Sequence, residues 1–77
     1  MMKELVEVLA QSLVDHPEEV SVTETEKEGE IILELKVAQD DMGKVIGKQG
    51  RIAKAIRAMV KAAASRTDKK VTVEIGH

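Results

Sequence analysis

The chain has 77 residues, enough for one small domain with a single core but not for two. It contains no cysteine, phenylalanine, tyrosine or tryptophan, which excludes disulfides, thiolate metal sites and aromatic platforms for stacking bases. The net charge of −2 hides a strong asymmetry: residues 1–41 carry −9 and residues 42–77 carry +7, so a polyanion would be attracted only to the second half.

The first half of the chain predicts a helix followed by a β-hairpin. Apolar residues recur at helical spacing over about residues 2–15, and the helix should end before Pro17, since the residue preceding proline is pushed out of helical geometry. Apolar and polar residues then alternate from about 20 to 26 and from 31 to 37, as is typical of half-buried strands. The intervening Lys27-Glu28-Gly29 is a short turn, so the two strands should pair as a hairpin.

The second half predicts two helices and a last strand. A short helix, capped by Asp40 or Asp41, should run through Ile46. A long helix from Arg51 to about Ala64 is rich in alanine, lysine and arginine, and alternation over 71–75 predicts the strand. The order α-β-β-α-α-β indicates an α+β domain in which a three-stranded sheet packs on helices. The stripe of the long helix expected to face the sheet consists of Ile52, Ile56, Met59, Val60 and Ala63.

Two glycines three residues apart separate the predicted helices, in the sequence Gly47-Lys48-Gln49-Gly50. We expect Gly47 to adopt the left-handed conformation that ends the first helix, and Gly50, which lacks a side chain, to let another backbone approach closely. The long helix would then direct its free N–H groups and the positive end of its dipole at the loop. Such an arrangement is typical of an anion site, and phosphate is the usual anion.

The surroundings of this loop are basic. We expect Lys48 to approach a phosphate, with Gln49 at the tip of the loop. Val45 and Ile46 are expected in the core, although one of the two could line a binding groove. The residues expected to broaden the basic surface are Lys44, Arg51, Lys54 and Arg57.

The run Asp41-Met42-Gly43-Lys44-Val45-Ile46-Gly47-Lys48-Gln49-Gly50-Arg51 resembles the GXXG signature of KH domains, which clamps about four nucleotides of single-stranded nucleic acid. The element order is similar to the type II KH fold over about residues 2–76, so residues 1–77 are expected to form a single KH domain. In length and motif the chain resembles small bacterial single-KH proteins of the KhpA type. This resemblance implies a protein that binds single-stranded RNA, as an RNA chaperone or post-transcriptional regulator.

Other glycine-rich motifs do not fit. A Walker P-loop needs glycine where Met42 stands and serine or threonine where Gln49 stands. A dinucleotide-binding fingerprint follows a strand, whereas this loop is predicted to follow a short helix. The open alternative is a KH-fold protein–protein interaction module with little or no nucleic-acid binding, which the acidic first half favours and the basic loop opposes.

We expect no enzymatic activity. No nucleophile–base pair or convergent carboxylate pair can be assembled, and His16 and His77 lack metal-ligand spacing. The sequence therefore predicts no cofactor, metal or small-molecule substrate. No apolar run reaches the roughly 18 residues of a membrane span, and no signal-peptide pattern opens the chain, so a soluble cytoplasmic protein that does not enter membranes is expected.

A stripe of small residues on the long helix suggests self-association. Ala55, Ala58 and Ala62 are spaced three and four residues apart, with Met59 beside them. Alanine permits close approach of a second helix, methionine adapts to an irregular surface, and pairing two KH domains would lengthen the RNA footprint. The resemblance likewise implies a homodimer and a heterodimer with a larger KH-containing protein of the KhpB type. The alternative is that alanine is present only as the best helix former.

Overall fold

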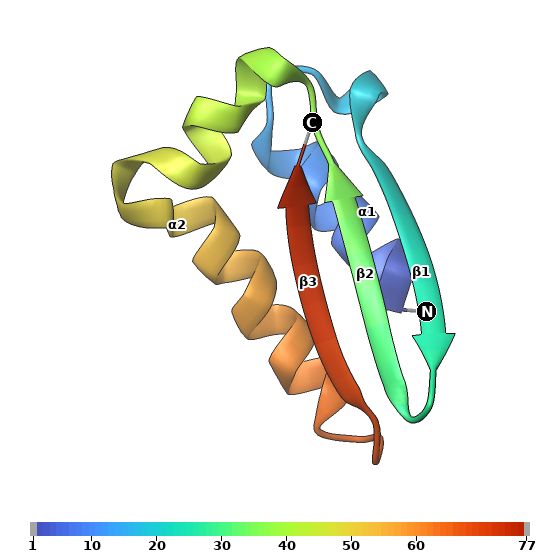
Figure 1. Cartoon of the computed structure of the whole chain (residues 1–77). Coiled ribbons are helices and arrows are strands. Elements are labelled where there is room, and N and C mark those ends of the chain that lie inside the picture. Colours follow the sequence, from blue (N-terminus) through green and yellow to red (C-terminus); the bar gives the residue numbers. More distant parts are fainter. Residues whose placement is uncertain (1, 77) are drawn as a thin grey trace.

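A computed structural model describes residues 2–76, except for the side chains of Lys48 and Gln49. One three-stranded sheet is covered on one face by the two long helices (Figure 1). In chain order the elements are α1 Met2–Leu13, the 3₁₀ helix η1 Pro17–Glu19, β1 Ser21–Lys27, β2 Glu30–Lys36, α2 Gln39–Ala64 and β3 Lys70–Gly76. The predicted α+β class and three-stranded sheet are confirmed.

The sheet combines one antiparallel and one parallel pairing, in the order β1-β2-β3. β1 and β2 form the predicted hairpin, closed by a turn in which Glu28 and Gly29 both have positive φ, 50° and 77°. Two such residues are typical of the tight turn whose twist matches that of the strands. β3 then pairs parallel to β2, a connection that needs a long crossover, and α2 supplies it.

α2 is sharply bent, and the two helices predicted for this region are its two arms (Figure 1). We call residues 39–49 the first arm and residues 51–64 the second arm. Gly50 lies between them with φ of 66°, a left-handed conformation that glycine adopts at little cost. The prediction that Gly47 is the left-handed residue was wrong, because helical backbone continues past Gly47 and the chain turns three residues later.

The start of α2 and the end of α1 also differ from expectation, for one shared reason. The N-cap of α2 is Ala38, and neither Asp40 nor Asp41 caps that helix with its side chain. Asp41 instead accepts hydrogen bonds from the backbone N–H groups of Asp15 and His16, at 3.1 and 3.0 Å. These N–H groups would otherwise continue the hydrogen bonding of α1, so α1 ends at Leu13 rather than near residue 15.

The core is aliphatic and lies between the sheet and the two helices. Its buried members are Val6, Ala10, Val22, Ile31, Leu33, Leu35, Val37, Val45, Ala53, Ile56, Val60 and Val73. Of the predicted stripe on the second arm, Ile56 and Val60 are buried, and Ile52 and Ala63 are half-buried. Met59 is 47% exposed and so lies at the edge of the buried face, in agreement with its other assignment beside the alanine stripe; Ala53, which was not in the predicted stripe, is buried.

Candidate nucleic-acid interface

The bend of α2 presents the two glycines of the motif in different backbone states. Gly50 needs to be glycine because of its positive φ. Gly47 has no such need: it lies within the helix, and a Cβ built on it would meet no atom within 4 Å. Neither a positive φ nor close packing explains glycine at this position, and its missing side chain leaves the surface of the bend open. The side chains of Lys48 and Gln49, predicted to form the tip, lie outside the described part of the structure.

Cations follow the bend along the second arm. Arg51 and Lys54 are exposed, and neither makes a hydrogen bond or ion pair with another described residue. Positive charge is therefore available to a ligand that reaches the start of this arm. Just before the bend, Val45 is fully buried whereas Ile46 is exposed, so Ile46 is the member of this pair that can meet a ligand.

A groove of about 570 Å³ runs between the second arm of α2 and β3, which lie side by side in Figure 1. Its lining residues are Arg57, Val60, Lys61, Ala64, Ser65, Val71, Thr72 and Val73. Arg57 was predicted only as part of the basic surface, but its Nη2 also donates a long hydrogen bond of 3.5 Å to the carbonyl oxygen of Val73. The groove was missed because its walls are adjacent only after the parallel pairing of β2 and β3 has formed.

The groove side of β3 is an open strand edge. The backbone groups of Lys70 and Gly76 point toward β2. The N–H of Lys70 donates to the carbonyl oxygen of Gly29, and the carbonyl oxygen of Gly76 accepts from the N–H of Val37. Backbone groups of successive strand residues point to opposite sides, so the odd-numbered residues Val71, Val73 and Ile75 direct theirs toward α2. The bond from Arg57 to Val73 agrees with this assignment. The edge can therefore donate and accept hydrogen bonds within a groove that also offers aliphatic side chains.

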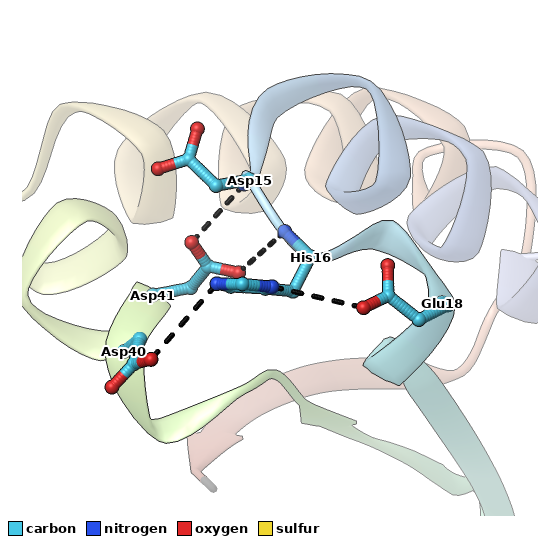
Figure 2. Close-up of polar contacts among 5 residues, drawn as sticks. All are labelled: Asp15, His16, Glu18, Asp40 and Asp41. Carbon is cyan, nitrogen blue, oxygen red and sulfur yellow. Dashed lines mark hydrogen bonds and ion pairs between the residues drawn. The ribbon is translucent and has the colours of Figure 1, made fainter.

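Lys44 belongs to the predicted basic surface, but it has an acidic partner. Its Nζ lies 3.1 Å from Oδ1 of Asp15, a residue in the segment that follows α1. Asp15 is itself held in place through its backbone N–H, which donates to the buried carboxylate of Asp41 (Figure 2). On the other side of that carboxylate, the His16 imidazole lies between Glu18 and Asp40, at 3.7 and 4.0 Å. The first arm thus begins in acidic surroundings, unlike the second.

The residues predicted to mediate pairing are all on the surface. Ala55, Ala58, Met59 and Ala62 are exposed. A second hollow, of about 520 Å³, extends this surface from α2 onto the first turns of α1. Its lining residues are Met2, Leu5, Met59, Ala62, Ala63 and Arg66. The contribution of α1 was not predicted, since sequence periodicity does not place two helices side by side.

Two further features concern metals and membranes. His16, Glu18 and Glu19 are the one group of possible metal ligands among residues 2–76, with ligand atoms within 4.8 Å of one another, but both glutamates are exposed. Clusters of exposed acidic groups are common without a bound ion.

Within the same residues, no helix combines the length and the apolar character that crossing a membrane requires.

Comparison with known proteins agrees with this geometry. The family model described as KhpA/KhpB, KH domain matches residues 3–75. A protein from Clostridium perfringens (strain 13 / Type A), named RNA-binding protein KhpA, is 70% identical over 74 residues, which are 96% of this chain and 99% of that protein. Proteins of the same name from Clostridium acetobutylicum and Listeria monocytogenes serovar 1/2a are 66% and 51% identical; each match covers 96% of this chain, and 99% and 97% of the respective protein. No solved structure gives a significant match. The chain therefore belongs to the KhpA/KhpB family of KH domains.

Proposed function

We propose that this protein binds single-stranded RNA and acts as an RNA chaperone or post-transcriptional regulator, without catalysing a reaction. The observation that carries the proposal is the bend fixed by Gly50, with an uncrowded surface at Gly47 and with exposed Arg51 and Lys54, which have no hydrogen-bond or ion-pair partner among the described residues. A sugar-phosphate backbone fits such a surface, because it needs both close approach and positive charge. Relatives named RNA-binding proteins support the choice of ligand. In this proposal residues 1–77 act as one KH domain in the cytoplasm, where RNA is available.

The phosphates would lie along the bend and the second arm. Gly47 and Gly50 shape the surface, Lys48 contacts a phosphate, and Gln49 lies at the tip. Lys44, Arg51, Lys54 and Arg57 provide the surrounding positive charge. Because these contacts are few, binding should be weak and should fall steeply as the salt concentration rises.

The bases would enter the groove between the second arm of α2 and β3. The chain has no aromatic side chain on which a base could stack, so apolar contacts must come from aliphatic residues, such as Val71 in the groove and the exposed Ile46 just before the bend. Base edges would meet the open backbone groups of β3. Arg57 already occupies one lone pair of the Val73 carbonyl oxygen, but at 3.5 Å this bond is weak and is easily lengthened or broken when a base approaches that acceptor.

Replacing Lys48 and Gln49 together by aspartate should weaken binding of a labelled single-stranded RNA about tenfold or more, since a hydrogen bond to a charged group contributes about 1.5–3 kcal/mol. Fluorescence anisotropy at low salt measures the affinity, and far-ultraviolet circular dichroism verifies folding. The matched control, Thr25→Asp with Lys36→Asp, makes the same change in charge on the sheet face that the helices leave open. Equal affinities of the parent and a folded loop variant would contradict the proposal and favour a protein-interaction module.

A second variant in the same titration separates binding from folding. Gly47→Ala should leave the free energy of unfolding unchanged or raise it by up to about 1 kcal/mol, because alanine is the better helix former and the space is empty. RNA affinity should nevertheless fall, since the new methyl group occupies the surface that the backbone approaches. A Gly47→Ala variant with undiminished affinity would mean that RNA does not use this surface.

We further propose that the protein forms a homodimer through Ala55, Ala58, Met59 and Ala62, joined by Met2 and Leu5 of α1. These side chains form one apolar surface across two helices, and exposed apolar surface of this kind is typical of interaction sites. A second copy is the commonest partner for such a surface. The same surface could pair with a larger KH-containing protein of the KhpB type, because one family model describes both KhpA and KhpB.

Replacing Ala58 by glutamate should convert the dimer to a folded monomer, since a buried carboxylate without a partner is costly at an apolar interface. Sedimentation at high micromolar concentration would report the oligomeric state of the variant and its parent. Thr25→Glu, which adds the same charge on the open face of the sheet, should leave the dimer intact. A parent that sediments as a monomer would remove the basis for the dimer while leaving the RNA proposal untouched.

A further inference from the structure

The ion pair between Asp15 and Lys44 links the acidic first half of the chain to the RNA surface. Their 3.1 Å contact joins residues 29 positions apart, so the fold and not local sequence brings them together. Both side chains stay accessible, at 70% exposed for Asp15 and 45% for Lys44. The pair can therefore open without disturbing the core.

Lys44 lies close enough to the bend to contact a phosphate bound there. It precedes Gly47 by three residues on the same helical arm, and residues three apart lie on one side of a helix. A phosphate held at Gly47 is thus within reach of the ammonium group of Lys44. The Lys44 ammonium has to move away from the Asp15 carboxylate, in part or completely, before it can form a full ion pair with the phosphate.

Asp15 is not a loosely placed surface carboxylate. Its backbone N–H donates to Oδ1 of Asp41 at 3.1 Å, and the neighbouring N–H of His16 donates to Oδ2 at 3.0 Å (Figure 2). Asp41 is 1% exposed and lies in the first turn of the arm that carries Lys44. The fold therefore fixes the backbone of Asp15 against the first arm, which keeps its carboxylate near Lys44.

We propose that Asp15 is a built-in competitor of the RNA phosphate for Lys44. This inference rests on the proposed function. In the free protein the carboxylate neutralises Lys44, and binding exchanges an intramolecular ion pair for a contact with phosphate. The exchange lowers affinity and makes it depend less on salt, because a lysine already paired with a carboxylate has less effect on the counterions that RNA releases. Asp15 thus keeps binding weak and reversible.

The test is a titration of labelled single-stranded RNA with the full chain over a series of salt concentrations. Asp15→Asn should raise affinity at low salt by up to about fivefold, the range that an exposed ion pair supports. It should also steepen the dependence of log affinity on log salt by up to about 0.7, the contribution of one phosphate contact on a single strand. Unchanged affinity and unchanged slope would overturn the inference.

Two controls separate competition for Lys44 from a general loss of negative charge. Glu18→Gln removes a nearby exposed carboxylate whose contact is with His16 rather than a lysine, so it should raise affinity less than Asp15→Asn does. In a Lys44→Met background, Asp15→Asn should give no more gain than Glu18→Gln. Equal gains from both acidic substitutions in the parent would overturn the inference and leave the RNA proposal standing. A parent that binds no RNA would overturn the proposed function itself.

Discussion

Replacing Leu33 by alanine should lower the free energy of unfolding by about 2–5 kcal/mol. Leu33 is completely buried in β2, the central strand, between Glu24 of β1 and Val73 of β3. Shortening this side chain removes apolar surface from the core and leaves a cavity beneath both helices. Domains of this size are stable by only about 5–15 kcal/mol, so one such cavity could unfold much of the population. Without aromatic residues, the core has few large side chains that could fill the space.

Denaturant unfolding followed by far-ultraviolet circular dichroism would measure the loss, since a chain without tryptophan or tyrosine offers little intrinsic fluorescence. Ile32→Ala is the matched control, one residue earlier in the same strand but on the sheet face that the helices leave open. Ile32 is only partly buried, so its truncation should cost clearly less. Similar losses of unfolding free energy for the two variants would contradict the assignment of Leu33 to the buried face of the sheet and Ile32 to the open face.

Much of the fold could be predicted because short-range patterns agree with one another. Alternation around Leu33 identifies β2, and a glycine at position 29 permits the positive φ that its tight turn requires. A break between two helices was likewise predicted at the glycines, where the structure has a bend within the single helix α2. The location of this bend at Gly50 rather than Gly47 was not predicted, because either glycine could adopt a left-handed conformation and only the packing of the two arms selects between them.

The remaining features depend on contacts between distant segments. The groove needs Arg57 and Val73 on facing elements, which follows only from the parallel pairing of β3. Met59 was assigned both to the sheet-facing stripe and to the alanine stripe, because a periodic pattern gives the apolar side of a helix only approximately. In the structure Met59 is exposed and Ala53 is buried. Lys44 was expected to be a free cation, and nothing in its local sequence indicates the carboxylate of Asp15.

Asp41 is the clearest case of a residue whose role was not predictable. Two adjacent aspartates before a helix are typical of an N-cap, and the sequence does not distinguish Asp40 from Asp41. In the structure the side chain of Asp40 is 87% exposed, whereas Asp41 is the one buried charged or polar residue in the part of the chain that is described. Its two oxygens accept the backbone N–H groups of Asp15 and His16, so the carboxylate ties the start of α2 to the segment that follows α1.

Replacing Asp41 by alanine should therefore lower the free energy of unfolding by about 2–4 kcal/mol, because two partly buried N–H groups lose their acceptors. Asp41→Asn keeps one acceptor oxygen and should lose about half as much, while Asp40→Ala should stay within about 0.5 kcal/mol of the parent. The same denaturant titration measures all three variants. Equal stability of Asp41→Ala and Asp40→Ala would mean that the buried carboxylate does not hold the two segments together. The competition between Asp15 and phosphate for Lys44 would then lose the hydrogen bonds that hold the backbone of Asp15 against the first arm.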